Sequence, residues 1–92
     1  MGHRYRSQAG IVHDMLQRLN EEGGMAPTRL STVANLPYDR LKSILERLER
    51  AGLVKRMRGE DGWIVYITEE GKETLEELKR AKTLLQQLGI RF

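Results

Sequence analysis

The sequence predicts an α+β fold in which three helices are followed by a two-stranded β-hairpin and a long last helix. Apolar residues recur at helical spacing over residues 7–51, alternate at strand spacing over residues 53–67, and return to helical spacing from Thr68 to about Leu88. With 92 residues the chain is expected to form a single small domain. A monomer of this size buries only about 60 to 65% of the surface that its unfolded chain exposes, so we expect a second chain to add to its core.

The first two predicted helices are marked by apolar stripes and by the residues that end them. The first runs from Ser7 to about Asn20, and Gly23-Gly24 ends it. The second runs from Thr28 to Asn35, with the Thr28 hydroxyl as its expected N-cap. Because a residue before proline disfavours the α region while proline fits a first helical turn, Pro37 is expected to begin the third helix.

The third predicted helix runs from Pro37 to about Ala51, and Gly52 supplies the left-handed residue that commonly ends a helix. Its inward face is expected to carry Leu41, Ile44, Leu45 and Leu48. Two predicted strands, 53–57 and 63–67, are then joined by a loop that contains two glycines. Trp63 lies two residues before Val65 in the second strand and is expected on the same apolar face, which favours packing of its ring in the core or at the base of the hairpin over stacking on a nucleic-acid base.

The last predicted helix, from Thr68 to about Leu88, is capped by Thr68 and begins with Glu69-Glu70, whose charges suit a helix N-terminus. Its later part carries a heptad seam formed by Leu78, Ala81, Leu85, Leu88 and Phe92. We expect this seam to join two copies of the chain in a homodimer, with Met15 and Leu19 of the first helix beside it. The alternative is that the helix folds back on its own monomer.

The net charge of +3 is distributed unevenly along the chain. Residues 1–58 hold 11 Lys and Arg against 6 Asp and Glu, a net charge of +5, whereas residues 59–92 hold 5 against 7, a net charge of −2. Of the 16 cations 11 are Arg, whose planar guanidinium suits phosphate and guanine edges. Arg enrichment is also common at the surfaces of heat-adapted proteins, so charge alone leaves both interpretations open.

Several classes of protein are disfavoured by what the sequence lacks. There is no cysteine for a disulfide or thiolate metal site, no apolar run of membrane-spanning length and no signal-peptide stretch at the N-terminus. The histidines are His3 and His13, and His13 is expected at the surface, pointing away from Asp14. No motif of a metalloprotease, serine hydrolase or phosphate-binding loop is present. We therefore expect an intracellular, cytoplasmic protein that is not an enzyme, with no catalytic residue, metal, cofactor or small-molecule ligand.

Three segments carry a resemblance to a known family. They are Leu30-Ser31-Thr32-Val33-Ala34-Asn35-Leu36-Pro37-Tyr38-Asp39-Arg40-Leu41, Leu48-Glu49-Arg50-Ala51-Gly52-Leu53-Val54 and Tyr66-Ile67-Thr68-Glu69-Glu70-Gly71-Lys72. With the order of the elements, and with the basic start at Arg4-Tyr5-Arg6-Ser7, they resemble the winged helix-turn-helix transcriptional regulators of archaea and archaeal viruses, which are mostly homodimers. The resemblance implies one domain over residues 1–92, with a basic arm at 1–6, a winged-helix core at 7–67 and a dimerisation helix at 68–92.

The resemblance also implies double-stranded DNA as a partner, with residues 37–51 as the recognition helix in the major groove. Arg40 is expected to read guanine, Ser43 either type of base, and Asp39 a cytosine or the orientation of Arg40. The expected DNA-binding residues are Arg4, Arg6, Thr28, Arg29, Ser31, Tyr38, Asp39, Arg40, Lys42, Ser43, Arg47, Lys55, Arg56 and Arg58. The alternative for the third helix is a solvated face with charge pairs such as Glu46 with Arg50.

The tip of the hairpin, Glu60-Asp61, departs from the pattern of a DNA-binding wing because acidic side chains repel phosphate. Either DNA meets only the flanks of the hairpin, at Lys55, Arg56 and Arg58, or the tip points away from the duplex. The expected function is that of a homodimeric transcriptional regulator. Two alternatives stay open, namely a sequence-neutral, chromatin-type DNA-binding protein and a winged-helix module for protein–protein contact.

Overall fold

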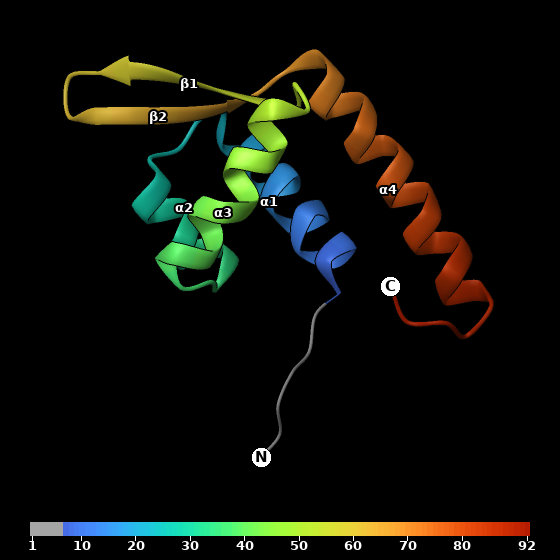
Figure 1. The fold of residues 1–92 in the computed structure, drawn as a ribbon. Helices are drawn as coiled ribbons and strands as arrows, with labels where there is room; N and C mark the ends of the chain where they lie inside the picture. Colours follow the sequence, from blue (N-terminus) through green and yellow to red (C-terminus); the bar gives the residue numbers. More distant parts are fainter. Residues whose placement is uncertain (1–6) are drawn as a thin grey trace.

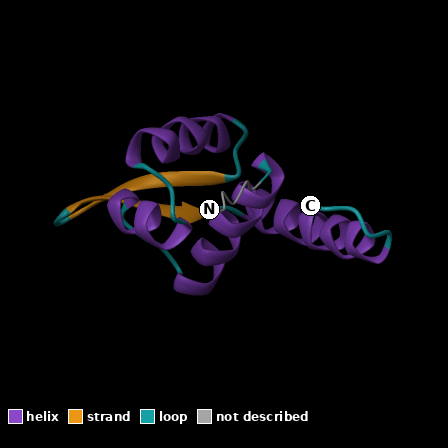
Figure 2. Cartoon of the chain, turned by 90° about the horizontal axis from the view of Figure 1, so that it is seen from below, coloured by secondary structure: helices purple, strands orange, loops and turns teal. Residues whose placement is uncertain are grey.

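Four helices and one β-hairpin make up residues 7–92, the part of the chain that the computed structural model describes. The elements are α1 (Gln8–Glu22), α2 (Pro27–Ala34), α3 (Tyr38–Arg50), β1 (Val54–Gly59), β2 (Gly62–Ile67) and α4 (Glu69–Gln87) (Figure 1). The predicted fold class and order of elements are confirmed. The hairpin and α4 extend in opposite directions from the bundle of α1, α2 and α3 (Figure 2). Arg4 and Arg6, expected in a DNA-binding arm, lie outside the described residues.

The core lies where α1, α2 and α3 meet the base of the hairpin and the start of α4. Its largest fully buried side chains are Ile11, Met15, Leu16, Leu19, Leu30, Leu41, Leu75 and Val65. Met15 and Leu19, expected beside a dimer seam, are instead 0% exposed, because the apolar stripe of α1 that carries them faces the interior of the protomer. Neither side chain is available to a second chain.

A short β-bridge between Met25 and Val65 ties the hairpin to the connection between α1 and α2. The Met25 N–H donates to the Val65 carbonyl at 3.0 Å, and the Val65 N–H donates to the Met25 carbonyl at 2.8 Å. Because an isolated two-stranded hairpin is at best marginally stable in water, this support is what lets the hairpin extend outward from the helices.

The first helical residue of α2 is Pro27, and its N-cap is Ala26, so the prediction that Thr28 caps this helix is wrong. Proline is well suited to this position because its missing N–H would have had no partner within the helix. Ala26 makes no capping hydrogen bond through its side chain. Thr28 is the second residue of the helix, two positions after the N-cap, so its hydroxyl is too late in the chain to act as the cap.

A tight turn fixed by Asn35 sets α3 against α2. Asn35 has a φ of 57°, in the left-handed region that asparagine adopts more readily than most residues. The Leu36 N–H donates to the Ser31 carbonyl at 3.0 Å and the Asn35 N–H to the Thr32 carbonyl at 3.2 Å, which is the bonding pattern of a Schellman motif. The Ser31 hydroxyl also donates to the Leu36 carbonyl. Pro37 then serves as the N-cap of α3, so the helix begins at Tyr38, one residue after the predicted start.

The hairpin is longer and its turn is tighter than predicted. Val54 lies opposite Ile67, and the pairing continues outward to Gly59 opposite Gly62. The turn is thereby reduced to Glu60-Asp61, in place of the predicted loop over 58–62. Gly62 has a φ of 123°, a conformation that residues with a Cβ rarely adopt.

Thr68 and Gly71 fix the start of α4 against the connection between α3 and β1. The Thr68 oxygen accepts from the Gly71 N–H at 3.0 Å, which confirms the predicted cap, and the same hydroxyl donates to the Gly52 carbonyl at 2.6 Å. A Cβ on Gly71 would lie 2.1 Å from the Leu53 carbonyl oxygen. Within segment 66–72, Thr68 is therefore needed as the helix cap, and Gly71 is needed because the backbone of Leu53 approaches it closely.

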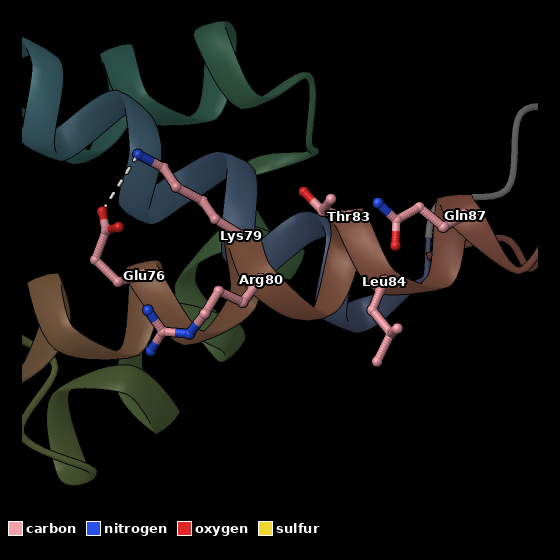
Figure 3. Close-up of a pocket in the computed structure, with 6 residues that line it drawn as sticks. All are labelled: Glu76, Lys79, Arg80, Thr83, Leu84 and Gln87. Atoms are coloured by element: carbon pink, nitrogen blue, oxygen red, sulfur yellow. Dashed lines mark hydrogen bonds and ion pairs between the residues drawn. The ribbon is translucent and has the colours of Figure 1, made fainter.

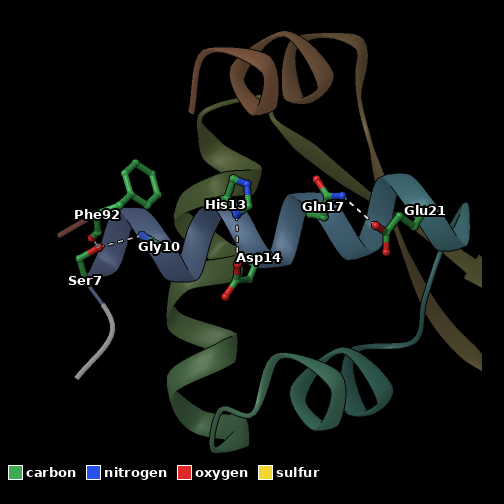
Figure 4. A network of polar contacts seen from close by, with 7 residues as sticks. All are labelled: Ser7, Gly10, His13, Asp14, Gln17, Glu21 and Phe92. Carbon is green, nitrogen blue, oxygen red and sulfur yellow. Dashed lines mark hydrogen bonds and ion pairs between the residues drawn. The ribbon is translucent and has the colours of Figure 1, made fainter. Parts of the chain in front are cut away.

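The last residues of the chain return to α1. Gly89, with a φ of 73°, ends α4 through hydrogen bonds from its own N–H to the Gln86 carbonyl at 3.1 Å and from the Ile90 N–H to the Leu85 carbonyl at 2.8 Å. The Ser7 hydroxyl donates to the Phe92 carbonyl (Figure 4). This reversal brings the two ends of the described chain together.

His13 is buried, at 9% exposed, so the prediction that it is a surface residue is wrong. The Phe92 ring packs edge-on against the imidazole, with 6.0 Å between ring centroids. The His13 Nδ1 lies 3.0 Å from Asp14 Oδ1, so these neighbouring side chains approach each other rather than point apart (Figure 4). The contact with Phe92 contributes to the burial of His13, because the returning C-terminal segment lies over this part of α1.

The predicted seam of α4 is divided between two environments. Four of its residues lie against the protomer. Leu78 packs against the core, Phe92 lies on α1, and Ala81 and Leu85 are half-buried. Leu88, in contrast, is 62% exposed. Part of α4 thus folds back on its own monomer. The exposed large apolar side chains near the end of α4 are Leu84, Leu88 and Ile90.

Candidate nucleic-acid interface

Helix α3 has one buried face and one exposed face. Leu41, Ile44, Leu45 and Leu48 are buried at the helical spacing that the sequence predicts. The exposed residues are Tyr38, Asp39, Arg40, Lys42, Ser43, Glu46, Arg47 and Arg50. Every residue expected to contact DNA from α3 therefore reaches solvent, and α3 presents a continuous polar surface to a ligand.

The cations on this surface are not neutralised by any residue of the described part of the chain. Among residues 7–92, Arg40, Lys42, Arg47 and Arg50 form no ion pair. The pair of Glu46 with Arg50, expected for a merely solvated helix face, is not formed in this part of the chain. The guanidinium and ammonium groups thus retain hydrogen-bond donors for an external acceptor.

The start of α2 contributes less than predicted to the exposed surface. Thr28 and Arg29 are exposed, and the Arg29 guanidinium lies 3.4 Å from Glu22, in a solvent-exposed pair of the kind that contributes little to stability. The Ser31 hydroxyl is occupied by its bond to the Leu36 carbonyl. Its observed role is to shape the turn before α3.

The flanks of the hairpin carry Lys55, Arg56 and Arg58, all of them exposed. The Arg56 Nε donates to Glu49 Oε2 on α3 at 3.1 Å, so this guanidinium connects the hairpin with α3. Within residues 7–92, Lys55 and Arg58 form no ion pair. The hairpin thus adds free positive charge beside α3, with its acidic turn farther out.

Trp63 is 44% exposed, so the prediction that its ring packs at the base of the hairpin is wrong. It lies on the same face of β2 as Val65, but two residues nearer the turn, where the hairpin extends beyond the helices. The Arg56 Cζ lies 5.4 Å from the Trp63 ring centroid and the Arg58 Cζ lies 5.2 Å from it. Both distances are within the range of a cation–π interaction.

The width of α3 is compatible with the major groove of a DNA duplex. A helix with its side chains is about 10 to 12 Å across, close to the roughly 12 Å width of the major groove. A helix in that groove places its exposed side chains against base edges and groove walls, while cations beside the helix can contact the sugar–phosphate backbone. This surface can therefore supply both base-edge and phosphate contacts.

Outside α3 and the hairpin, a functional site could use a metal-binding cluster or a pocket. Among residues 7–92, no cluster of three or more His, Cys, Asp or Glu could hold a metal ion. A shallow depression on α4 is lined by Glu76, Lys79, Arg80, Thr83, Leu84 and Gln87 (Figure 3). All six belong to one helix, so the depression brings together no groups from different elements. No helix in the described residues is long and apolar enough to cross a membrane.

The chain belongs to the winged helix-turn-helix family, whose model matches residues 5–86. In this fold α2 and α3 form the helix-turn-helix and the β1–β2 hairpin is the wing. A search of curated proteins finds no match.

Solved structures with the same fold come from archaea and bacteria. Sso10a-2, a DNA-binding protein from Sulfolobus solfataricus, is 25% identical with a TM-score of 0.81, over 90% of this chain and 85% of that one. A MarR family protein from Bacillus stearothermophilus is 31% identical with a TM-score of 0.70, over 92% of this chain and 61% of that one. The transcriptional regulator BldR from Sulfolobus solfataricus is 23% identical with a TM-score of 0.69, over 83% of this chain and 60% of that one. The chain thus spans most of Sso10a-2 but only about three fifths of the two other proteins.

Proposed function

We propose that the protein is a homodimeric transcriptional regulator that binds double-stranded DNA with α3 in the major groove. The observation that carries this proposal is the exposed face of α3, where Arg40, Lys42, Arg47 and Arg50 form no ion pair within residues 7–92. Membership of the winged helix-turn-helix family supports it, as do the likenesses to BldR and to a MarR family protein. The resemblance of segment 66–72 to archaeal and archaeal-virus regulators, together with the likenesses in Sulfolobus solfataricus, supports an archaeal type.

Arg40 is the residue that we propose reads a base. It lies in the first turn of α3, the part of a recognition helix nearest the base edges, and its guanidinium can donate to guanine O6 and N7 together. Arg47 lies two turns later and is proposed to contact phosphate. Ser43, between them on the exposed face, is proposed to contact either type of base, and Asp39 is proposed to accept from cytosine or to orient Arg40.

Arg40→Ala should weaken binding to a duplex selected by the wild-type protein by about 1 to 3 kcal/mol, a factor of roughly 5 to 150. The loss should be much smaller on a scrambled duplex of the same composition, because a base contact carries sequence information and a phosphate contact does not. Mobility-shift titrations of both duplexes measure the two losses. Arg47→Ala serves as the matched control, with equal losses expected on both duplexes. Equal losses for Arg40→Ala would reduce Arg40 to a backbone contact.

The proposed dimer contact involves the exposed apolar end of α4. Leu84 and Leu88 are 56% and 62% exposed and lie one helical turn apart, and the half-buried Ala81 and Leu85 lie next to them. A second copy of the chain would cover these side chains and enlarge a core that is small at 92 residues. Pairing through α4 would also separate the two copies of α3, most simply by about one turn of the duplex, ~34 Å.

Leu88→Glu is expected to convert the dimer into a monomer, because a carboxylate would be buried without a partner in the contact. The fold should survive, since Leu88 is 62% exposed in the protomer. Light scattering measures the mass, with Gln86→Glu as the control because residue 86 lies on a different side of the helix. A Leu88→Glu variant that keeps the dimer mass would remove this end of α4 from the contact.

A second candidate function is sequence-neutral coating of DNA. The observation in its favour is the likeness to Sso10a-2, described as a DNA-binding protein, of which the chain covers 85%. The same basic surface would serve both functions, and they differ in the ratio of specific to non-specific affinity.

A further inference from the structure

Trp63 is an apolar side chain that the fold leaves without a place in the core. It is the only tryptophan in the sequence and is 44% exposed, although Val65 on the same strand face is fully buried. The difference arises because the outer half of the hairpin extends past the helices that cover Val65 (Figure 2). Trp63 therefore offers an aromatic surface outside the protomer core.

Two guanidinium groups accompany this ring. The Arg58 Cζ lies 5.2 Å from the ring centroid, and Arg58 is directly opposite Trp63 in the hairpin register. The Arg56 Cζ lies 5.4 Å from the centroid, and its Nε is held by Glu49 of α3 at 3.1 Å. The ring and both cations are thus arranged by strand pairing and by one contact with α3, before any ligand binds.

An aromatic ring beside fixed cations suits an unpaired nucleotide better than a closed duplex. Proteins that bind single strands combine aromatic side chains, on which bases stack, with cations that follow the phosphates. In an intact duplex the faces of the bases stack on one another, so a tryptophan outside the grooves has no base face to contact. Beyond this cluster the acidic turn Glu60-Asp61 disfavours phosphate, which confines a strand to the part of the hairpin that carries Trp63.

We propose that Trp63, Arg56 and Arg58 form a second nucleic-acid site, which binds an unpaired nucleotide of single-stranded DNA. The base stacks on the Trp63 ring, and the flanking phosphates accept hydrogen bonds from Arg56 and Arg58. The site lies on the hairpin and is separate from the base-reading face of α3. The Trp63 ring takes no part in base reading by α3, so single-strand stacking and duplex readout can each fail without the other.

The single tryptophan makes the site directly observable. The full chain is titrated at low salt with a single strand of about 12 thymidines or adenosines, a length within the range that one single-strand site covers. Trp63 fluorescence should change and then reach saturation. A fully paired duplex of the same length should give a much smaller change. Fluorescence that does not respond to either single strand would overturn the proposal.

Substitutions of Trp63 distinguish stacking of its ring on a base from a role in which the ring only holds Arg56 and Arg58 in place. Trp63→Ala should weaken single-strand binding, measured by anisotropy of labelled strands, by roughly 5- to 150-fold, the factor expected for loss of one stacked base. Trp63→Phe should recover much of this loss because it keeps an aromatic ring, and Arg80→Ala on α4 is the remote charge control. Circular dichroism checks the fold of each variant.

Duplex binding provides the decisive contrast. Trp63→Ala should leave the affinity for a selected duplex nearly unchanged, whereas Arg40→Ala should lower that affinity and leave single-strand binding intact. Equal losses on both ligands for Trp63→Ala, with no recovery in Trp63→Phe, would show that Trp63 only supports the neighbouring arginines and would overturn the stacking site.

Discussion

Duplex binding should weaken by about 10³- to 10⁵-fold when monovalent salt rises from about 50 to 200 mM, the loss expected for a protein that neutralises about six to ten phosphates. Each protomer offers cations for this purpose at Lys42, Arg47, Arg50 and Lys55, none of which is in an ion pair within residues 7–92. Two protomers on one duplex reach the required number. The affinity measured by fluorescence anisotropy at several salt concentrations gives the slope directly.

Single substitutions identify which cations contribute to that slope. Arg47→Ala should reduce its magnitude by about one for each phosphate contact that is lost. Arg80→Ala should leave the slope unchanged, because Arg80 lies on α4 and its guanidinium is 2.7 Å from Glu77. A wild-type affinity that changes less than about tenfold over this range would contradict phosphate binding by the α3 and hairpin surface.

Gly71→Ala should destabilise the fold by about 2 kcal/mol or more, equivalent to a decrease in Tm of roughly 10 °C for a domain of this size. The added Cβ would lie 2.1 Å from the Leu53 carbonyl oxygen and 2.6 Å from Ile67 Cγ1, so the backbone between α3 and β1 would have to move. In an unhindered helix the same change would stabilise the protein by about 0.5 to 1 kcal/mol. The sign of the effect therefore distinguishes a close backbone approach from ordinary helix propensity.

Thermal and urea denaturation, followed by circular dichroism, measure this difference in the free energy of unfolding. Glu70→Ala is the matched control, because Glu70 is the preceding residue of α4 and is exposed. Its effect should stay within about 0.5 kcal/mol. A Gly71→Ala protein as stable as the wild type, or more stable, would show that α4 does not approach Leu53 as closely as the structure has it.

The arrangement of elements was predictable because local signals agree with the final packing. The apolar stripe of α3 alone determines its exposed face, so the polar surface from Tyr38 to Arg50 follows from helical spacing. Thr68 caps α4 as its position in the sequence indicates. At α2 two local signals compete, and Pro27 begins the helix one residue before Thr28.

Features that depend on long-range packing were not predictable. Strand alternation places Trp63 on the face of Val65, but it does not reveal how far the helices extend beneath that face. The burial of His13 depends on Phe92, which returns from the other end of the chain after the reversal at Gly89. The contact of Arg56 with Glu49 requires the hairpin to pack on α3, and no spacing rule within one element reports it. Such contacts require the tertiary structure.

Selection from a pool of random-sequence duplexes tests sequence readout by a dimer most directly. Two copies of α3 in successive major grooves predict enrichment of a motif with two related half-sites, about 10 base pairs apart from centre to centre. Arg40→Ala should lose preference at one position in each half-site. Retention of duplexes without any enriched motif would instead establish sequence-neutral binding, and a pool that is not retained at low salt would contradict duplex binding altogether.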